Sequence, residues 1–384
     1  MIKILTIIGA RPQFVKAAAL SRAIRKKFSK EIKETLVHTG QHYDDNMSEV
    51  FFKEMEIPKP KYNLNIGSDT HGKQTGTMIE KIEEVLTKEK PDCVILYGDT
   101  NSTLAGAIAS VKIHIPVVHI EAGLRSFNKT MPEEINRIVC DHCSTLLFSP
   151  TKTGVRNLIK EGFSENNFPP YHVDNSKIYH CGDVMYDNTL YFSCIAEKKS
   201  DIFRKYGLKE NEFILATIHR NNNTDNSERL TSIFHSLNKI SLEKKINIVL
   251  PLHPRTSKAM KKNLSEEVFA AVKNNNMFYL LPPVSFFEMM VLEKNCKMIF
   301  TDSGGVQKEA FFFKKPCIIL RSETEWIELV ECGSAKITDT NEKKIEGAFR
   351  YFNNRKKISF PQIFGDGHAS EFICKKLVKI FSKS

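Results

Sequence analysis

Residues 93–125 read CVILYGDTNSTLAGAIASVKIHIPVVHIEAGLR. Two short apolar runs, 93–97 and 116–120, flank a segment of helical length, and each run is followed by acidic and glycine residues. A strand, a helix and a second strand in this order are typical of a βαβ unit, whose two strands pair in parallel. The stretch therefore predicts an α/β fold with a parallel sheet.

The same unit recurs along the whole chain. Predicted strands lie at 2–8, 35–39, 93–97, 116–120 and 145–149, and again at 213–218, 246–251, 278–281, 298–301 and 317–320. Helices are expected in the gaps between them. We therefore predict two doubly wound, Rossmann-like domains, with no sequence repeat between them.

The length of the chain also favours two domains, because 384 residues exceed the usual size of a single hydrophobic core. The polar segment 165–177 is typical of an exposed loop before the last strand of the first domain. We assign residues 1–182 to an N-terminal domain and 183–367 to a C-terminal domain. Apolar residues recur at helical spacing near the end of the chain, so we expect the C-terminal helix, 368–384, to pack back on the N-terminal domain.

Composition and charge exclude several classes of protein. Hydrophobic residues at 41% and charged residues at 26% are ordinary for a globular chain. The formal charge is +11, but the basic residues are spread singly or in pairs, so we expect no nucleic-acid partner. No apolar run approaches the roughly 18 residues of a membrane span. We therefore expect no membrane partner, no anchor and no signal peptide.

Cysteine usage and the common cofactor motifs point the same way. Nine scattered cysteines, an odd number, predict reduced thiols in a cytoplasm. Only Cys140 and Cys143 have a metal-like spacing, and no second pair follows, so we expect packing on a helix and no metal. No G-x-G-x-x-G follows a strand, and the P-loop-like segment 67–73 lacks the following Ser or Thr. We expect no cofactor.

Polar residues gather directly after four predicted strands of the first half, where ligands of open parallel sheets bind. These residues are 9–16, 40–42, 98–100 and 121–125. Asp99 and Glu121, taken singly, have a simpler interpretation as helix caps or first-turn acids. Together with Glu133-Glu134 and Arg137, they predict an acidic cluster with its own cation. Such a cluster suits proton transfer, because neighbouring charges separate the pKa of an acid from that of a base.

The second half predicts a different kind of site. Residues 301–309, TDSGGVQKE, follow a strand and open a helix, so their backbone N–H groups can face a phosphate. The simpler alternative is a serine cap with a flexible glycine pair. His219-Arg220 and His253 follow two other strands, and histidines that face a phosphate loop are candidates for diphosphate contacts.

Seven motifs, co-linear over nearly the whole chain, carry a family resemblance. They are Gly9-Ala-Arg11-Pro12, Gly40-Gln41-His42, Tyr97-Gly98-Asp99-Thr100, His119-Ile-Glu121-Ala-Gly123-Leu-Arg125, Pro132-Glu133-Glu134-Ile-Asn136-Arg137, His219-Arg220 and Thr301-Asp302-Ser303-Gly304-Gly305. The set resembles the non-hydrolysing UDP-N-acetylglucosamine 2-epimerases. The resemblance implies two Rossmann-like domains in a glycosyltransferase-B arrangement, with the nucleotide sugar in the cleft between them and UDP on the C-terminal domain.

The resemblance also implies roles for individual residues. Asp99, Glu121 and Glu133 would transfer protons around the sugar, and His219 would join them and contact the diphosphate. Gln41 and His42 match positions that contact a second, activating UDP-sugar in bacterial relatives. The remaining implied contacts are Arg11, Ser303, Gly304 and Gly305 to the diphosphate, Glu309 to the ribose, and Lys16 and Arg137 along the cleft.

The implied reaction converts UDP-N-acetylglucosamine to UDP-N-acetylmannosamine without releasing the sugar. UDP leaves C1, a carboxylate removes the C2 proton to give a 2-acetamidoglycal, and the proton and UDP return with C2 inverted. The resemblance further implies a homodimer.

Several alternatives remain open from the sequence. Residues 182–187 and 321–328 look more like the branch that acts on UDP-2,3-diacetamido-2,3-dideoxyglucuronic acid, whose carboxylate would need Arg321, Arg125 or Lys16 as a cation. A retaining UDP-sugar glycosyltransferase shares the fold and the donor, although the acidic cluster argues against it. A hydrolysing epimerase and a non-catalytic nucleotide-sugar sensor are further alternatives.

Overall fold

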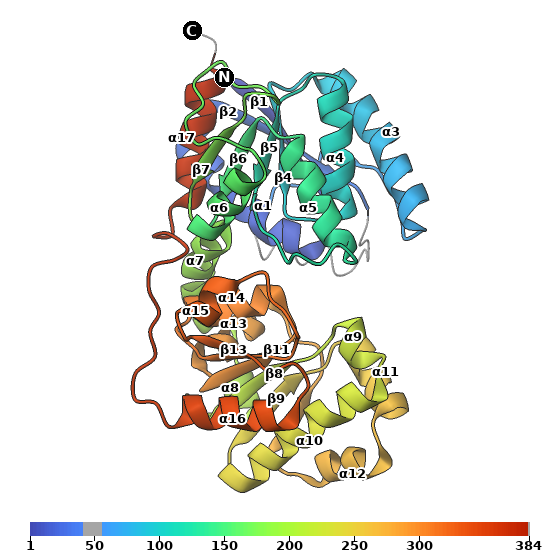
Figure 1. Ribbon diagram of the computed structural model, residues 1–384, viewed down its shortest axis with the longest axis vertical. Helices are drawn as coiled ribbons and strands as arrows, with labels where there is room; N and C mark the ends of the chain where they lie inside the picture. The colour runs from blue at the N-terminus through green and yellow to red at the C-terminus, as the bar shows by residue number, and fades with distance from the viewer. Residues whose placement is uncertain (41–55, 383–384) are drawn as a thin grey trace. The chain divides into compact units, whose positions relative to one another are not determined.

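The computed structural model of the protein describes residues 1–40 and 56–382, without the side chain of Arg11 (Figure 1). Contacts between residues divide the chain into two compact units. The first unit contains Met1–Asn188 and Gln362–Ser384, and the second contains Thr189–Pro361. The first unit is therefore discontinuous in sequence, and the second is inserted into it.

The first unit is built on a parallel sheet, which has seven strands among the described residues, in the order β3-β2-β1-β4-β5-β6-β7. β1 is central and pairs with both β2 and β4. The strands are β1 (Ile2–Ile8), β2 (Ile32–His38), β3 (Tyr62–Asn63), β4 (Cys93–Tyr97), β5 (Val117–Ile120), β6 (Leu146–Ser149) and β7 (Lys177–His180).

Helices follow the strands of the first sheet in alternation. Helices α3, α4 and α5 contribute Met78, Ala105 and Cys140 to one hydrophobic core, where they meet Leu5 of β1 and Leu96 of β4. The helices are α1 (Arg11–Ala23), a π-helical turn η1 (Ile24–Phe28), α3 (His71–Glu89), α4 (Asn101–Lys112), α5 (Pro132–His142), α6 (Lys152–Lys160), the first part of α7 (Val184–Lys199) and α17 (Ala369–Phe381).

The second unit repeats this plan with a parallel sheet of six strands, in the order β10-β9-β8-β11-β12-β13. Its strands are β8 (Phe213–Thr217), β9 (Asn247–Pro251), β10 (Phe278–Leu281), β11 (Met298–Thr301), β12 (Cys317–Ile319) and β13 (Ala335–Ile337). Its helices are α8 (Ile202–Tyr206), α9 (Asn221–Thr224), α10 (Ser227–Lys244), α11 (Pro254–Asn263), α12 (Glu266–Asn274), α13 (Phe286–Asn295), α14 (Gly304–Phe312), α15 (Ile327–Glu331) and α16 (Glu342–Asn353).

Both sheets reverse their winding direction at one place, between β1 and β4 in the first unit and between β8 and β11 in the second. In open α/β sheets the carboxyl ends of the strands at such a switch point form the usual ligand site. The residues that follow β1, β4, β8 and β11 are therefore the first to inspect.

The predicted α/β class with two Rossmann-like domains is confirmed, and all ten predicted strands are present. Residues such as Val94 and Ile95 are fully buried in strands covered on both faces, which explains the continuous apolar runs. β2 begins three residues before the predicted start. Glu34 interrupts the apolar pattern on which the prediction depended, but the strand accommodates its carboxylate inside the fold, where it accepts hydrogen bonds from Thr6 and Ser21. The short β3 and β13 were missed because two or three residues carry no periodic signal.

The C-terminal helix α17 belongs to the first unit, where it packs on α1 and η1 (red beside the blue and green elements in Figure 1). Its apolar stripe is fully buried at Ile373, Cys374 and Leu377. The Asp187 carboxylate accepts hydrogen bonds from the backbone N–H of Ala369 (3.1 Å) and Ser370 (2.8 Å), and so caps the helix. Both ends of the sequence are thus required to complete this unit.

We predict that Leu377→Ala lowers the free energy of unfolding by about 2–5 kcal/mol, because it leaves a cavity under a fully buried helix face. The exposed Leu242 serves as a matched control, and Leu242→Ala should change stability by no more than about 0.5 kcal/mol. Urea unfolding followed by circular dichroism measures both. Equal effects of the two substitutions would show that α17 contributes little to the core.

Candidate functional site

The two strand ends at the first switch point are joined by the buried side chain of Gln13, which lies in the first turn of α1. Its Oε1 accepts hydrogen bonds from the backbone N–H of Gly9 (2.8 Å) and Ala10 (3.0 Å). Its Nε2 donates to the carbonyl of Tyr97 at 3.0 Å. Gln13 therefore fixes the loop after β1 against the end of β4. The sequence analysis missed this role, and a glutamine in an otherwise apolar helix face was the available signal.

Lys16 and Glu121 form a buried ion pair above these strand ends. Lys16 comes from α1, and Glu121 follows β5 directly with a left-handed backbone (φ +80°). A non-glycine residue in this region is strained, and such strain persists mainly at functional sites. Gly98 (φ +62°) provides the space, because a Cβ at this position would lie 3.0 Å from the Lys16 Nζ and 3.3 Å from the Glu121 Oε2.

Asp99 lies between the end of β4 and the capping residue of α4, with its side chain partly exposed. Its Oδ2 is 3.2 Å from the Nη1 of the buried Arg137. Burial raises the pKa of Asp99, against the lowering effect of the Arg137 and Lys16 charges. The structure therefore brings together Asp99, Glu121, Lys16 and Arg137, as the strand-end pattern predicted.

The adjacent glutamates of α5 have opposite surroundings. Glu133 is exposed at the first turn, where its charge acts on Asp99. Glu134 is buried, and its carboxylate accepts hydrogen bonds from the backbone N–H of Ser126 and Phe127, both at 2.9 Å. Glu134 thus shapes the preceding loop, and Glu133 is the one with access to a ligand.

A buried chain of alternating charges lies behind Asp99, and the sequence analysis did not predict it. His119 of β5 contacts the Asp141 carboxylate at 2.6 Å and the carbonyl of Gly98 at 2.8 Å. Asp141 is also 2.8 Å from the Arg125 Nη2, and Arg125 forms two hydrogen bonds with Glu161. His119 lies inside β5 and not after its end, where the sequence analysis looked for functional residues. The only sequence signal for its role was a histidine within an apolar run.

At the second switch point, the buried Asp302 organises the loop after β8. Its carboxylate accepts hydrogen bonds from the backbone N–H of His219 and Arg220 and from the Asn223 Nδ2, each at 3.1 Å. The His219 ring is partly exposed and lies 6.1 Å from the His253 ring, centroid to centroid. The two predicted strand-end histidines are therefore neighbours.

Helix α14 begins beside this loop, and Ser303 caps it by accepting a hydrogen bond from the Val306 N–H. Gly304 and Gly305 occupy its first two positions, and a Cβ on either would make only ordinary contacts. Their absent side chains leave the N–H groups of this turn open to an anion. Arg321 and Glu325 form a buried, bidentate ion pair next to Gly304.

Glu309 lies one turn further along α14, close to the buried Glu293 of α13. Burial, together with the charge of Glu309, raises the pKa of Glu293 well above its usual range. This arrangement gives Glu309 a fixed neighbour and was not predicted.

Three predicted site residues cannot be placed. Gln41 and His42 lie outside the described residues, and the side chain of Arg11 is likewise not described, although its backbone begins α1. Cys140 and Cys143 pack in and against the core of the first unit. Within residues 1–40 and 56–382, no cluster of three or more His, Cys, Asp or Glu side chains has a metal-binding arrangement.

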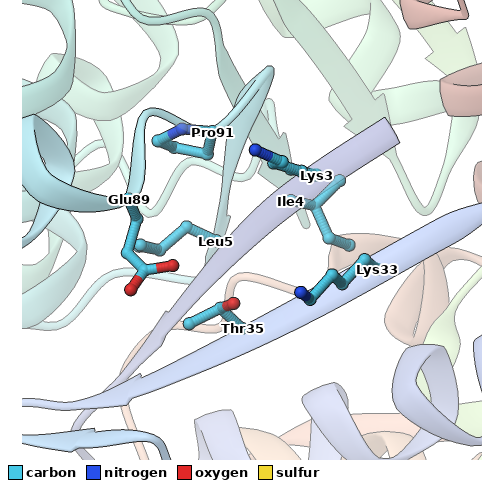
Figure 2. A pocket seen from close by; sticks show the side chains of 7 residues that line it. All are labelled: Lys3, Ile4, Leu5, Lys33, Thr35, Glu89 and Pro91. Atoms are coloured by element: carbon cyan, nitrogen blue, oxygen red, sulfur yellow. The ribbon is translucent and has the colours of Figure 1, made fainter. Parts of the chain in front are cut away.

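A cavity of about 70 Å³ lies toward the amino-terminal ends of β1 and β2, opposite the carboxyl ends described above (Figure 2). It is lined by residues from the amino-terminal halves of β1 and β2 and by Glu89 and Pro91. Small-molecule pockets in proteins are several times larger, typically about 300 Å³ or more. This cavity is therefore too small to hold a ligand of that kind.

Comparison with known proteins gives consistent matches over the whole chain. The family profile described as UDP-N-acetylglucosamine 2-epimerase matches residues 24–378. The chain is 47% identical over 376 residues to a UDP-N-acetylglucosamine 2-epimerase homolog of Methanococcus maripaludis, covering 98% of this chain and 99% of that protein. It is 46% identical over 379 residues to the UDP-2,3-diacetamido-2,3-dideoxy-D-glucuronate 2-epimerase of Pseudomonas aeruginosa, covering 98% of this chain and 100% of that protein.

Solved structures resemble the chain in both sequence and fold. The Methanocaldococcus jannaschii UDP-GlcNAc 2-epimerase, crystallised with UDP-GlcNAc and UDP, has a TM-score of 0.86 and 42% sequence identity. The match covers 98% of this chain and 99% of that one.

We predict that Lys16→Met destabilises the protein by about 3–5 kcal/mol at neutral pH, because it removes the ammonium group that pairs with the buried Glu121 carboxylate. The double variant Lys16→Met/Glu121→Gln should recover part of this loss, since the buried charge is then removed as well. Thermal unfolding of the two variants compares them directly. A double variant that is less stable than Lys16→Met would contradict the assignment of a costly unpaired charge.

Proposed function

Because the chain belongs to the UDP-N-acetylglucosamine 2-epimerase family, we propose that it inverts C2 of UDP-N-acetylglucosamine to give UDP-N-acetylmannosamine. The family suggested by the seven motifs is confirmed by these matches, and the chain is an enzyme of the isomerase class. The observation that carries the proposal is the pair of carboxyl groups, Asp99 and Glu121, held at one switch point in different electrostatic surroundings.

The reaction needs two carboxyl groups because the proton on C2 leaves one face of the sugar and returns to the other. That proton has no adjacent carbonyl to acidify it. Departure of UDP from C1 creates positive charge on the ring, and a carboxylate can then remove the proton to leave a 2-acetamidoglycal. The catalytic groups must therefore be carboxylates on the sugar side and hydrogen-bond donors on the diphosphate side.

The two carboxyl groups have different cationic partners, Lys16 for Glu121 and Arg137 for Asp99. Glu121 has the Lys16 ammonium as its direct counter-ion. Burial raises the pKa of Asp99, which favours its protonated form more than in water. We propose that Asp99, Glu121 and the exposed Glu133 transfer protons, with Lys16 and Arg137 orienting the sugar.

The second unit has the donors that a diphosphate requires. Asp302 holds the His219 loop in place, and Ser303 caps a helix whose first two residues are glycines. We propose diphosphate contacts from Arg11, His219, Ser303, Gly304 and Gly305, and a ribose contact from Glu309. Gln41 and His42 remain proposed contacts to a second, activating UDP-sugar.

A second candidate substrate is UDP-2,3-diacetamido-2,3-dideoxyglucuronic acid, on which the Pseudomonas aeruginosa relative acts according to its name. Its carboxylate would need a cation. Arg125 is paired with Asp141 and Glu161, Arg321 with Glu325, and Lys16 with Glu121. The three cations considered from the sequence are thus already paired, which supports the N-acetylglucosamine substrate.

We further propose a homodimer in the cytoplasm, with residues 1–182 and the returning C-terminal helix as one domain and 183–367 as the UDP-binding domain. All nine cysteines lie among the described residues and none is in a disulfide, which supports a reducing compartment. No described helix is long and apolar enough to cross a membrane.

We predict that UDP-N-acetylglucosamine incubated with the enzyme in deuterated water gains deuterium at C2 while its C2 epimer accumulates. The abstracted proton exchanges with solvent before it returns, so both products of the equilibrium carry the label. Proton NMR follows the exchange, with the diacetamido-uronate run in parallel. Absence of C2 exchange with both substrates would refute epimerisation, and release of free N-acetylmannosamine with UDP would indicate a hydrolysing enzyme instead.

We predict that Asp99→Asn, Glu121→Gln and Glu133→Gln each lower turnover by about a hundredfold or more, the usual contribution of general acid–base catalysis. UDP affinity should change much less, since these residues lie on the sugar side. Initial rates and calorimetric titration with UDP measure the two effects separately.

A control variant should lose UDP affinity, which the three acid variants should keep. Ser303→Asp places a negative charge at the start of α14 and should abolish UDP binding while the protein stays folded. If the three acid variants keep near-normal rates, the proposed carboxyl groups are not the proton-transfer residues.

A further inference from the structure

His119 is a fully buried histidine whose two ring nitrogens both face hydrogen-bond acceptors. Its Nδ1 is 2.6 Å from the Asp141 Oδ1, and its Nε2 is 2.8 Å from the carbonyl oxygen of Gly98. A carbonyl oxygen can only accept, so Nε2 must carry a hydrogen.

The hydrogen-bond partners of Asp141 decide the state of the other nitrogen. The Asp141 Oδ2 accepts a hydrogen bond from the Gly123 N–H at 3.1 Å and lies 2.8 Å from the Arg125 Nη2. One hydrogen lies between Nδ1 and Oδ1, and the two donors on Oδ2 favour its position on Nδ1. Burial acts to raise the pKa of Asp141, but the charges and hydrogen bonds of His119 and Arg125 outweigh it and lower the pKa. The arrangement therefore favours the doubly protonated imidazolium.

The groups packed around His119 balance this buried charge. From α5 the anion is Asp141, with the Cys140 thiol beside it, and the loop after β5 contributes Arg125, which is itself paired with Glu161. Burial acts to lower the pKa of His119, but Cys140 and Asp141 outweigh it and raise the pKa well above its usual value. Cation and anion alternate from His119 to Glu161, so the buried chain is close to neutral.

The imidazolium holds the peptide group that precedes Asp99. The carbonyl of Gly98 receives the His119 Nε2 hydrogen, and the carbonyl of Asp99 receives a hydrogen bond from the Asn136 Nδ2 at 2.9 Å. Both carbonyls that flank the Asp99 Cα are therefore fixed by buried donors. Gly98 has a left-handed backbone, and a glycine can leave this conformation easily. The hydrogen bond from His119 restricts that freedom.

We propose that His119 is a permanently charged positioning residue, which fixes the Asp99 carboxyl for the reaction at C2 and takes no part in proton transfer itself. The proposal rests on the proposed epimerase function, because Asp99 is a catalytic residue only there. It gives the HIEAGLR motif a second role besides supplying Glu121.

The first test is NMR of the wild-type enzyme labelled with nitrogen-15 in histidine. The His119 ring should keep both N–H groups from about pH 6 to about pH 9, across the range in which an unperturbed imidazole loses its charge. Assignment uses the loss of one signal set in His119→Asn, or in His119→Gln if the first variant does not fold. A neutral ring, or titration near pH 6.5, would overturn the proposal without any reference to activity.

The second test is a double-mutant cycle of His119→Asn and Asp99→Asn. His119→Asn should lower kcat by about a hundredfold, as a displacement near 1 Å does, and leave UDP affinity within about twofold. In the Asp99→Asn background the same substitution should have no further effect, because its only target is gone. His172→Asn, at an exposed histidine of the same unit that lies outside this chain of charges, is the matched control and should keep the wild-type rate.

The outcomes separate this proposal from the proposed function. Equal losses from His119→Asn in both backgrounds would mean that the residue supports the fold in general and does not act through Asp99. If wild type shows no C2 exchange at all, the epimerase proposal fails first, and the NMR result still decides whether His119 is a permanent cation.

Discussion

The first unit depends on one physical constraint, that a charge removed from water must be paired. Lys16 and Glu121 satisfy it across α1 and the end of β5, and their neighbours are arranged to permit this. Glu121 adopts a strained backbone to reach the ammonium, and Gly98 lacks the side chain that would block it. The carboxyl group that we propose for proton transfer is thus held by the same pair that stabilises the junction of the strands.

In the proposed function, the two units would contact the nucleotide sugar by different means. The first relies on side-chain charge, with Asp99 and Glu121 set against Lys16 and Arg137. The second relies on backbone N–H groups, which Asp302 and Ser303 aim by accepting hydrogen bonds from neighbouring residues. This division follows the chemistry, because proton transfer needs titratable groups and a departing diphosphate needs fixed donors.

The sequence predicted the parts of this architecture that repeat. Strands buried on both faces give unmistakable apolar runs, and Asp99 and Glu121 were found because each follows such a run directly. The residue pattern alone did not distinguish Glu133 from Glu134, since only the rotation of α5 decides which carboxylate is buried, and Glu133 was singled out by the family resemblance. His119, Asp141 and Gln13 were missed because their roles come from partners distant in sequence, and Glu34 hid the start of β2 for the same reason.

The return of α17 to the first unit has a consequence for synthesis on the ribosome. The second unit is one continuous segment, so all of its strands and helices, the last of which is α16, can come together before α17 is made. The first unit is divided in sequence, so the stripe of α1 and η1 that α17 covers stays uncovered until α17 has left the ribosome. The part of the first unit that precedes residue 189 is therefore completed only after the second unit has been made, and during that interval the nascent chain exposes an apolar surface of the kind that chaperones bind.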